Sequence, residues 1–171
     1  YKAAKKESID LLAKHGNKKI AFISGALIDA INGQARMGGY KEALAENGLD
    51  YNEGLIFEAP YNFKEGLALT ERILNSGATA AYVTDDELAI GLLDGLIDKG
   101  VKVPEDFEII TSNDSLLTEV ARPRLSSVTQ PLYDIGAVAM RLLTKMMNKE
   151  EIEQKTIELP HGIFEKGSTK E

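Results

Sequence analysis

A stretch near the carboxyl end of the chain places residues that can recognise an anion at helical spacing. The pattern predicts an amphipathic helix over residues 134–147. At 3.6 residues per turn, one face of it holds an acid, a valine and two cations: Asp134, Val138, Arg141 and Lys145. A guanidinium holds a phosphate group through two parallel hydrogen bonds, so this face could bind a phosphorylated protein. The same spacing also describes a solvated face with extended basic side chains, and spacing alone favours that interpretation.

A second face of the same predicted helix is apolar. It consists of five side chains: Ile135, Ala139, Leu142, Leu143 and Met146. An apolar patch of this kind promotes association when it is left in water. We therefore expect it to be covered by another segment of the protein or by a neighbouring molecule.

Small and polar residues follow several of the predicted strands. They form four groups: Ser24-Gly25, Thr84-Asp85-Asp86, Ser112-Asn113-Asp114 and Thr129-Gln130. Ligands of open parallel α/β sheets bind beyond the carboxyl ends of the strands, so these groups predict a cleft for a polar ligand. Helix capping explains Asp85, Asp86 and Asp114 equally well, because aspartate is a preferred N-cap residue. The adjacent Asp85 and Asp86 would also suit acid–base chemistry, although capping is the more common role of such a pair.

Alternating strand and helix patterns position these residues. Apolar strand patterns cover residues 19–24, 55–58, 78–83, 107–111 and 126–129, and a last extended segment is predicted at 155–164. Helical patterns cover residues 2–15, 33–47 (or from Asn32), 63–75, 85–99 and 134–147. Apolar strands that alternate with helices predict an α/β fold with a doubly wound parallel sheet. We expect the strands with KIAFIS and AAYVT to lie against the core.

The composition of the chain argues against several classes of function. Its 171 residues are 43% hydrophobic and 27% charged, which is typical of one globular domain or one large lobe. The net charge of −7 argues against nucleic-acid binding by these residues alone. The chain has no cysteine, and therefore no disulfide or thiolate metal site. The absence of cysteine fits a cytoplasmic protein, and no apolar run reaches the length of a membrane span, so we expect no membrane contact.

Sequence motifs of common enzyme classes are absent from the chain. It has no GxGxxG after a first strand, no phosphate-binding loop and no GxSxG nucleophile motif. The two histidines lack metal-ligand spacing: His15 is expected to cap a helix end, and His161 to lie at the surface or at a strand end. We therefore expect no catalytic residue, no metal and no cofactor.

Five sequence blocks, in order, carry a family resemblance. They are IAFISG, RMGGYKEAL, AAYVTDDELAIGLL, GVKVPEDFEIITSND and RPRLSSVTQPLYDIGAVAMRLL. Together they resemble the lactose-repressor family of bacterial transcription regulators over essentially the whole chain. The resemblance implies a type I periplasmic-binding-protein-like fold with two lobes, preceded by a helix-turn-helix DNA-binding domain.

The resemblance also implies how this chain is divided. Residues 1–130 would form the C-terminal lobe of the effector-binding and dimerisation core. Residues 131–171 would contain a crossover helix and a terminal strand that pack on the N-terminal lobe. The DNA-binding domain would be absent, so we expect a fragment that reaches operator DNA only through the missing domain.

Four positions of this chain match the effector cleft of the family. The resemblance implies that Arg36 holds ligand oxygens, that Asp85 accepts hydrogen bonds from sugar hydroxyls, and that Gln130 faces the cleft from the crossover. Asn113 occupies a position that is usually aspartate in sugar-binding relatives. An uncharged amide accepts fewer hydroxyl protons, which weakens the expectation of tight free-sugar binding.

The carbon-catabolite branch of the family fits this departure, because its main co-repressor is a protein. In that branch the partner is the serine-phosphorylated phosphocarrier HPr, with small sugar phosphates as secondary effectors. The implied contacts with HPr are Tyr133, Asp134, Val138, Arg141 and Lys145, with Arg141 as the phosphate ligand. The resemblance further implies a homodimer through the C-terminal lobe, including the helix with Ile90 and the loop near Ala121.

Three classes of function remain open at the level of the sequence. The main expectation is the effector- and co-repressor-binding region of a regulator of carbon catabolite control, without enzymatic activity. The alternative is the sugar-binding component of a transport system, which shares the two-lobed fold. An enzyme on a doubly wound sheet is the third, and the absent motifs argue against it.

Overall fold

The computed structural model describes residues 2–25, 33–152, 154 and 156–171, with the backbone only at 33–36. The strands are β1 (Ile20–Ser24), β2 (Ile56–Glu58), β3 (Ala80–Val83), β4 (Glu108–Ser112), β5 (Ser126–Thr129) and β6 (Gly162–Phe164). The helices are α1 (Lys2–Lys14), α2 (Gly33–Glu46), α3 (Phe63–Asn75), α4 (Asp86–Asp98), α5 (Leu116–Val120) and α6 (Leu132–Met147), with a short 3-10 turn η1 (Glu53–Leu55).

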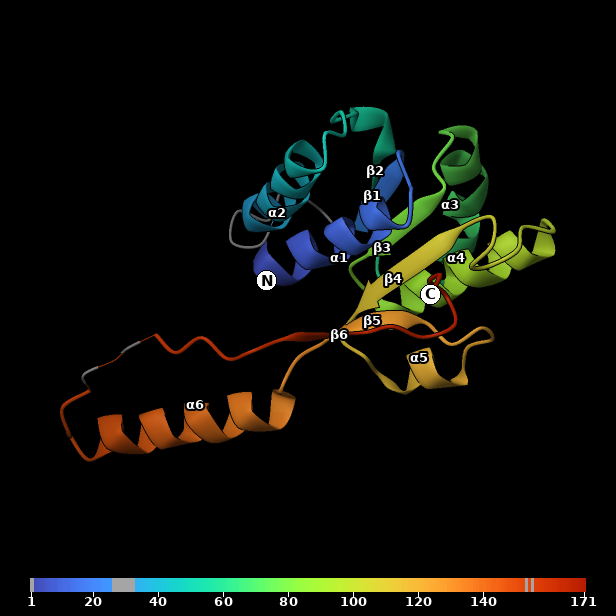
Figure 1. Cartoon of the computed structure of the whole chain (residues 1–171). Coiled ribbons are helices and arrows are strands. Elements are labelled where there is room, and N and C mark those ends of the chain that lie inside the picture. The colour runs from blue at the N-terminus through green and yellow to red at the C-terminus, as the bar shows by residue number, and fades with distance from the viewer. Residues whose placement is uncertain (1, 26–32, 153, 155) are drawn as a thin grey trace.

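The strands form one sheet in the order β2-β1-β3-β4-β5-β6 (Figure 1). The first five strands of the chain pair in parallel, whereas β6 runs antiparallel to β5. The register places Phe22 of β1 beside Tyr82 of β3, and Tyr82 beside Ile110 of β4. Every residue of β1 and β3 is buried, as expected for strands against the core. The predicted doubly wound α/β fold is confirmed.

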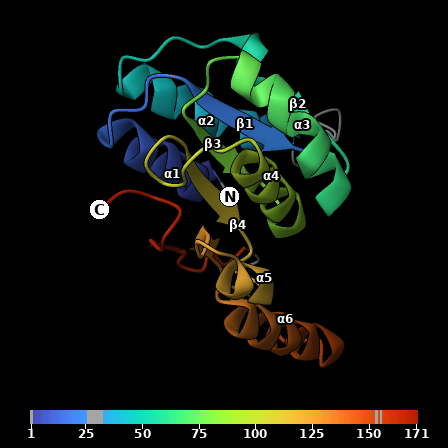
Figure 2. The same ribbon diagram turned by 90° about the vertical axis from the view of Figure 1, so that its right-hand side faces the viewer.

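Helices cover both faces of the sheet, and each face has its own apolar layer (Figure 2). Successive side chains of a strand point to opposite faces, so Ile23 of β1 lies in the layer with α3 and α4. Phe22, its neighbour, lies in the layer with α1 and α2 and stacks on Tyr82 with ring centroids 6.0 Å apart. Burial of a side chain of this size contributes roughly 1.5–3 kcal/mol to stability.

The ends of α3 and α4 follow from capping residues. Asn62 precedes α3, and its side chain accepts a hydrogen bond from the backbone amide of Glu65. Asp85 has the same role before α4. Gly77 and Gly100 follow the two helices with φ angles of 78° and 76°, a left-handed conformation that terminates a helix.

Two short elements, η1 and α5, have no counterpart in the sequence-based prediction. They contain three and five residues, which is too few to display a helical period. α6 begins at Leu132, two residues before the predicted start, because the helical turn forms directly after Pro131. These differences leave the topology unchanged.

The carboxyl-terminal residues contact the sheet of this chain, within the segment whose helix and strand the resemblance places against an N-terminal lobe. β6 pairs with β5, with Ile163 opposite Val128. Further on, the Ser168 hydroxyl is buried; it donates to the carbonyl of Ile109 at 2.6 Å and accepts from the amide of Ser126 at 2.8 Å. The last residues of the chain therefore pack on this sheet. The hydrogen bonds of the Ser168 hydroxyl to strand backbone hold them there, and a search for apolar periodicity does not detect such contacts.

Helix α6 extends away from the layered part of the fold (Figure 1). No residue of α6 is buried, and its apolar face is open, with Ile135 and Leu143 exposed by 41% and 47%. Leu142 alone on this face is half-buried, so the described residues provide only part of the cover that we expect.

None of the described helices is both long enough and apolar enough to cross a membrane.

Candidate functional site

Asp85 lies at the predicted cleft, directly after β3. It is half-buried, and its Oδ1 accepts hydrogen bonds from the amides of Glu87 and Leu88 at 3.0 and 3.2 Å. Among the described residues, no donor reaches its second oxygen, Oδ2. Capping and ligand binding are therefore compatible at Asp85, because each uses a different oxygen.

Asp86 has a different environment from its neighbour. It is 3% exposed, and it accepts hydrogen bonds from the Thr111 hydroxyl at 2.9 Å and the Ser115 amide at 2.8 Å. Burial raises the pKa of Asp86, although both hydrogen bonds favour the charged form. The carboxylate joins α4 to β4 and to the following loop. Asp85 and Asp86 therefore do not form an exposed acid–base pair.

The loop after β4 contains two successive residues in the left-handed region. The φ angles of Asn113 and Asp114 are 84° and 50°. Asn113 is exposed at the carboxyl end of β4, and no described group forms a hydrogen bond with its side-chain amide. The N-cap position of α5 belongs to Ser115, so the alternative role of Asp114 as an N-cap is not observed.

Asp114 instead receives three hydrogen bonds on one carboxylate oxygen. Its Oδ1 lies 2.5 Å from Ser127 Oγ, 2.7 Å from Lys166 Nζ and 3.2 Å from Thr118 Oγ1. Partial burial raises the pKa of Asp114, but the hydrogen bonds and the Lys166 charge outweigh it, so the net pKa is below the ordinary value. Lys166 also pairs with Glu119 at 2.6 Å. Burial lowers the pKa of Lys166, but the two carboxylates raise it by more, so the net pKa is above the ordinary value.

Three residues that shape this edge are missing from the sequence-based prediction: Tyr61, Ser127 and Lys166. Thr84 donates its hydroxyl hydrogen to the Tyr61 oxygen at 3.1 Å. Lys166 and Asp114 are 52 residues apart in the chain, and Tyr61 and Thr84 are 23 apart. No local pattern links residues at such separations, so only the folded sheet brings them together.

Gln130 and Arg36 complete the predicted cleft set. Gln130 is half-buried after β5, and its backbone carbonyl accepts a hydrogen bond from the Leu132 amide at 2.8 Å. Because β3, β4 and β5 are parallel neighbours, Asp85, Asn113 and Gln130 share the carboxyl edge of the sheet. Arg36 belongs to α2, but its side chain lies outside the described residues.

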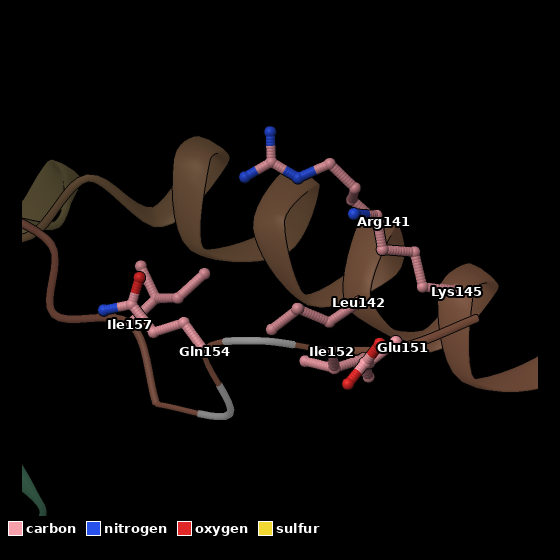
Figure 3. A pocket seen from close by; sticks show the side chains of 7 residues that line it. All are labelled: Arg141, Leu142, Lys145, Glu151, Ile152, Gln154 and Ile157. Carbon is pink, nitrogen blue, oxygen red and sulfur yellow. The ribbon is translucent and has the colours of Figure 1, made fainter. Parts of the chain in front are cut away.

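The predicted anion-binding face is present on α6. Tyr133, Asp134, Arg141 and Lys145 are exposed, and Val138 is half-buried. Asp134 lies in the first turn and Lys145 in the last, where each charge complements the helix dipole. Figure 3 shows Arg141 and Lys145 extending to the same side of the helix.

A groove of about 390 Å³ adjoins this face, between α6 and the segment that returns from it. Its lining residues are Arg141, Leu142, Lys145, Glu151, Ile152, Gln154 and Ile157. In Figure 3, Leu142 points toward Ile152 and Gln154, away from the Arg141 guanidinium. The groove therefore has an apolar floor at Leu142 and a charged rim that contains two cations and the Glu151 carboxylate.

The predicted dimer positions lie on α4 and at the end of α5. Ile90 is half-buried against the core, and Ala121 is 8% exposed. Leu116 and Val120 of α5, which the prediction did not name, are exposed by 74% and 55%. The open apolar surface in this region is therefore that of α5 itself.

The two histidines do not form a metal site. His15 follows α1, and its Nδ1 lies within hydrogen-bond distance, 2.7 Å, of Oε1 of the fully buried Glu108, so its side chain contacts the sheet and does not cap the helix as predicted. His161 directly precedes β6, at a strand end as predicted. Within the described ranges, no cluster of His, Cys, Asp and Glu side chains has the arrangement of a metal site.

Comparison with known proteins places the chain in a family. A model described as a periplasmic binding protein-like domain matches residues 9–169. Catabolite control protein A of Streptococcus mutans is 60% identical over 170 residues, which cover 99% of this chain and 51% of that protein. The crystal structure of the transcription regulator CcpA of Lactococcus lactis is similar with a TM-score of 0.94 and 53% identity, over 99% of this chain and 62% of that chain.

A more distant structure is the sugar-binding transcriptional regulator of the LacI family from Escherichia coli, complexed with phosphate. It is 28% identical with a TM-score of 0.87, over 98% of this chain and 60% of that chain. The chain spans about half the length of the curated relatives that it matches. On the match over residues 9–169 and these similarities, the chain belongs to the periplasmic-binding-protein-like family, in its lactose-repressor group of transcription regulators.

Proposed function

We propose that this chain is part of the effector-binding and dimerisation region of a transcription regulator in bacterial carbon catabolite control. The observation that carries the proposal is the exposed face of α6, in a chain that is 60% identical to a catabolite control protein A. The region acts by binding and not by catalysis. It works in the cytoplasm without membrane contact, and operator DNA is bound by a separate N-terminal domain.

The partner that fits the α6 face is serine-phosphorylated HPr. Arg141 binds the phosphoserine through two parallel charge-assisted hydrogen bonds, and Lys145 adds a second positive charge one turn away. Val138 offers apolar contact area one turn before Arg141, and Tyr133, about two turns before Arg141 on the same helix, adds an aromatic ring that is 87% exposed. Tyrosine and arginine are enriched among the residues that contribute most to binding at protein interfaces.

The cleft at the carboxyl edge of the sheet would take a small sugar phosphate as a second effector. Asp85 Oδ2 accepts a hydrogen bond from a sugar hydroxyl, because the capping bonds occupy only Oδ1. The amides of Asn113 and Gln130 donate to phosphate oxygens without the repulsion that a carboxylate would exert. Arg36 supplies the cation. The phosphate complex of the Escherichia coli regulator supports this assignment.

The assembly that we propose is a homodimer formed through this lobe. Its interface includes α4 with Ile90, the end of α5 with Ala121, and the exposed side chains of Leu116 and Val120. Leu116 and Val120 are one turn apart on α5, so their exposed side chains can form one apolar patch that a partner subunit would cover.

Calorimetric titration of the chain with two forms of HPr tests the central assignment. We expect binding of serine-phosphorylated HPr and much weaker binding of unphosphorylated HPr, because the phosphate supplies the charge that Arg141 recognises. The full-length Streptococcus mutans relative serves as the reference protein. Equal binding of both forms would contradict phosphate recognition. Binding by the relative but not by the chain would show that the α6 face is insufficient.

A further inference from the structure

The loop that carries Asn113 is held from three directions. Ser115 is fixed by its amide, which donates to Asp86 at 2.8 Å. Asp114 is fixed by its side chain, which accepts from Ser127 of β5 and from Lys166. Asn113 has no such bond among the described groups and is exposed at the carboxyl end of β4. The bonds to Asp114 and Ser115 therefore fix the backbone that carries Asn113, while the Asn113 side chain itself has no hydrogen bond to a described group.

The conformation of the loop requires this support. Asn113 and Asp114 both have positive φ; asparagine and aspartate tolerate this region better than other non-glycine residues, but they usually adopt it singly and not in succession. Such a conformation persists only where its surroundings determine it from several sides. Without the bonds to Asp114, the loop would relax toward ordinary backbone angles and the Asn113 amide would move.

Lys166 is the only cation among the described residues that pairs with Asp114. Its backbone is itself held in place, because its amide donates to the Ser126 hydroxyl at 2.7 Å. Its side chain is 13% exposed, and the ammonium group has three oxygen partners, on Asp114, Thr118 and Glu119. A largely buried lysine with three oxygen partners has one fixed side-chain conformation, so it can hold the position of the loop.

We propose that Lys166 is a positioning residue of the effector cleft, which acts through Asp114 to hold the Asn113–Asp114 turn and present the Asn113 amide to the ligand. This inference rests on the proposed cleft. Lys166 lies two residues beyond β6, near the carboxyl end of the chain. Through Asp114 it therefore connects the carboxyl-terminal residues to the loop after β4.

Glu119 provides a matched control. Lys166 contacts Glu119 at 2.6 Å and Asp114 at 2.7 Å, but the Glu119 side chain is 47% exposed and that of Asp114 is 24% exposed. Glu119→Gln removes a charge partner of Lys166 and leaves Asp114 intact. If Lys166 only stabilises the residues after β6, the loss of either carboxylate partner should change ligand affinity to a similar extent. If Lys166 positions Asn113, only the loss of its contact with Asp114 should lower the affinity.

The experiment combines NMR of the chain with titration of glucose 6-phosphate. The variants are Lys166→Met, Lys166→Arg, Ser127→Ala, Glu119→Gln, Asn113→Ala and the double variant Asn113→Ala/Lys166→Met. In Lys166→Met we expect displaced amide resonances at residues 113–115 and an affinity lowered about tenfold, in the range of coupled neighbours. Lys166→Arg should restore most of the affinity, and Glu119→Gln should leave it unchanged. In the Asn113→Ala background, Lys166→Met should have no additional effect.

Several outcomes would overturn the inference. Unchanged resonances at 113–115 in Lys166→Met would do so, as would additive losses of affinity in the double variant. If Lys166→Met does not fold, Ser127→Ala removes one donor to Asp114 at nearly constant volume and should show the same loss in weaker form. If the wild-type chain does not bind glucose 6-phosphate, the proposed cleft function fails, and the resonances of residues 113–115 still decide whether Lys166 holds the turn.

Discussion

The imidazole of His15 lies 2.7 Å from the carboxylate of Glu108, although 93 residues separate them in the chain. Glu108 is fully buried at the start of β4, and its other donors are Asn17 Nδ2 at 2.5 Å and the Lys170 amide at 2.8 Å. One carboxylate therefore joins the end of α1, the middle of the sheet and the last residues of the chain. Its removal leaves buried donors without an acceptor.

Glu108→Ala should therefore be strongly destabilising. We expect the free energy of unfolding to fall by about 3–5 kcal/mol, because the loss of the carboxylate leaves the partners of three short hydrogen bonds and the Lys170 ammonium without an acceptor. Urea unfolding followed by circular dichroism measures the change. Glu105→Ala, at an exposed acid three residues earlier, should change it by less than about 0.5 kcal/mol. Equal effects of both substitutions would mean that the buried network adds no stability.

Gly91→Ala should disrupt the packing of α3 against α4. A β-carbon at Gly91 would overlap the backbone carbonyl of Phe63, which cannot move without displacing α3. We expect a loss of about 1–3 kcal/mol from overpacking, measured by thermal unfolding. Gly136→Ala in α6 is the matched control, because no described atom outside its own helix backbone lies within 4 Å of the position of its β-carbon. It should add helix content and gain up to about 1 kcal/mol of local helix stability. A Gly91→Ala protein as stable as the wild type would contradict this account.

Arg141→Ala should weaken the binding of serine-phosphorylated HPr without affecting the fold. The expected loss is roughly 2–5 kcal/mol, the usual cost of removing one partner of an interfacial charge pair. Because Arg141 is exposed, the melting temperature should stay constant. Arg141→Lys should recover only part of the affinity, since an ammonium cannot form two parallel hydrogen bonds.

Calorimetry of the wild type and both Arg141 variants provides the measurement. Lys64→Ala, at an exposed cation on α3, controls for the loss of one positive charge. Wild-type affinity in Arg141→Ala would identify the stripe on α6 as a solvated helix face.

The Asp114–Lys166 pair predicts a specific dependence of stability on pH. The pKa of Asp114 is lowered in the folded chain, so its contribution is present above the ordinary carboxyl value of 3.8 and is lost as pH falls through the lower, folded value. Asp86 has the opposite effect on stability: burial raises its pKa in the folded chain, so its contribution to the free energy of unfolding becomes more favourable as the pH falls.

Urea unfolding of wild type and Asp114→Asn at pH values from about 3 to 7 tests this dependence. We expect the difference in free energy of unfolding to be largest at neutral pH and to narrow as the solution becomes more acidic than about pH 4. Asp50→Asn, at an exposed carboxylate, is the control and should differ little from the wild type at any pH. A difference that is constant over the whole range would show that the charge of Asp114 is not responsible.

Dimerisation through α5 predicts that a charge on its surface is disruptive. Leu116→Glu should shift the chain from dimer to monomer in sedimentation equilibrium, because an unpaired carboxylate would be buried in the interface. Leu132→Glu places the same charge on an exposed leucine of α6 and should leave the dimer intact. A monomeric wild type, or equal effects of the two substitutions, would argue against this interface.

Most of the fold was predictable because its signals are local. The alternation of apolar strands with helices predicts the parallel sheet, and cap residues such as Asn62 and Asp85 mark helix starts within a residue or two. The stripe on α6 was predictable for the same reason, since helical spacing alone places Arg141 and Lys145 on one side. α5 escaped prediction because five residues carry no period.

The sequence by itself determined the strand and helix order, the parallel sheet and the side-chain types at the carboxyl edge, because these depend on residues close together in the chain. The tertiary structure decided that Asp86 is buried while Asp85 keeps a free oxygen, that Lys166 reaches Asp114, and that the chain end returns to the sheet at Ser168. The physical reason is the distance along the chain over which each effect acts. Periodicity and capping act over one or two turns, whereas burial, pKa shifts and ion pairs depend on which distant strands the fold brings together.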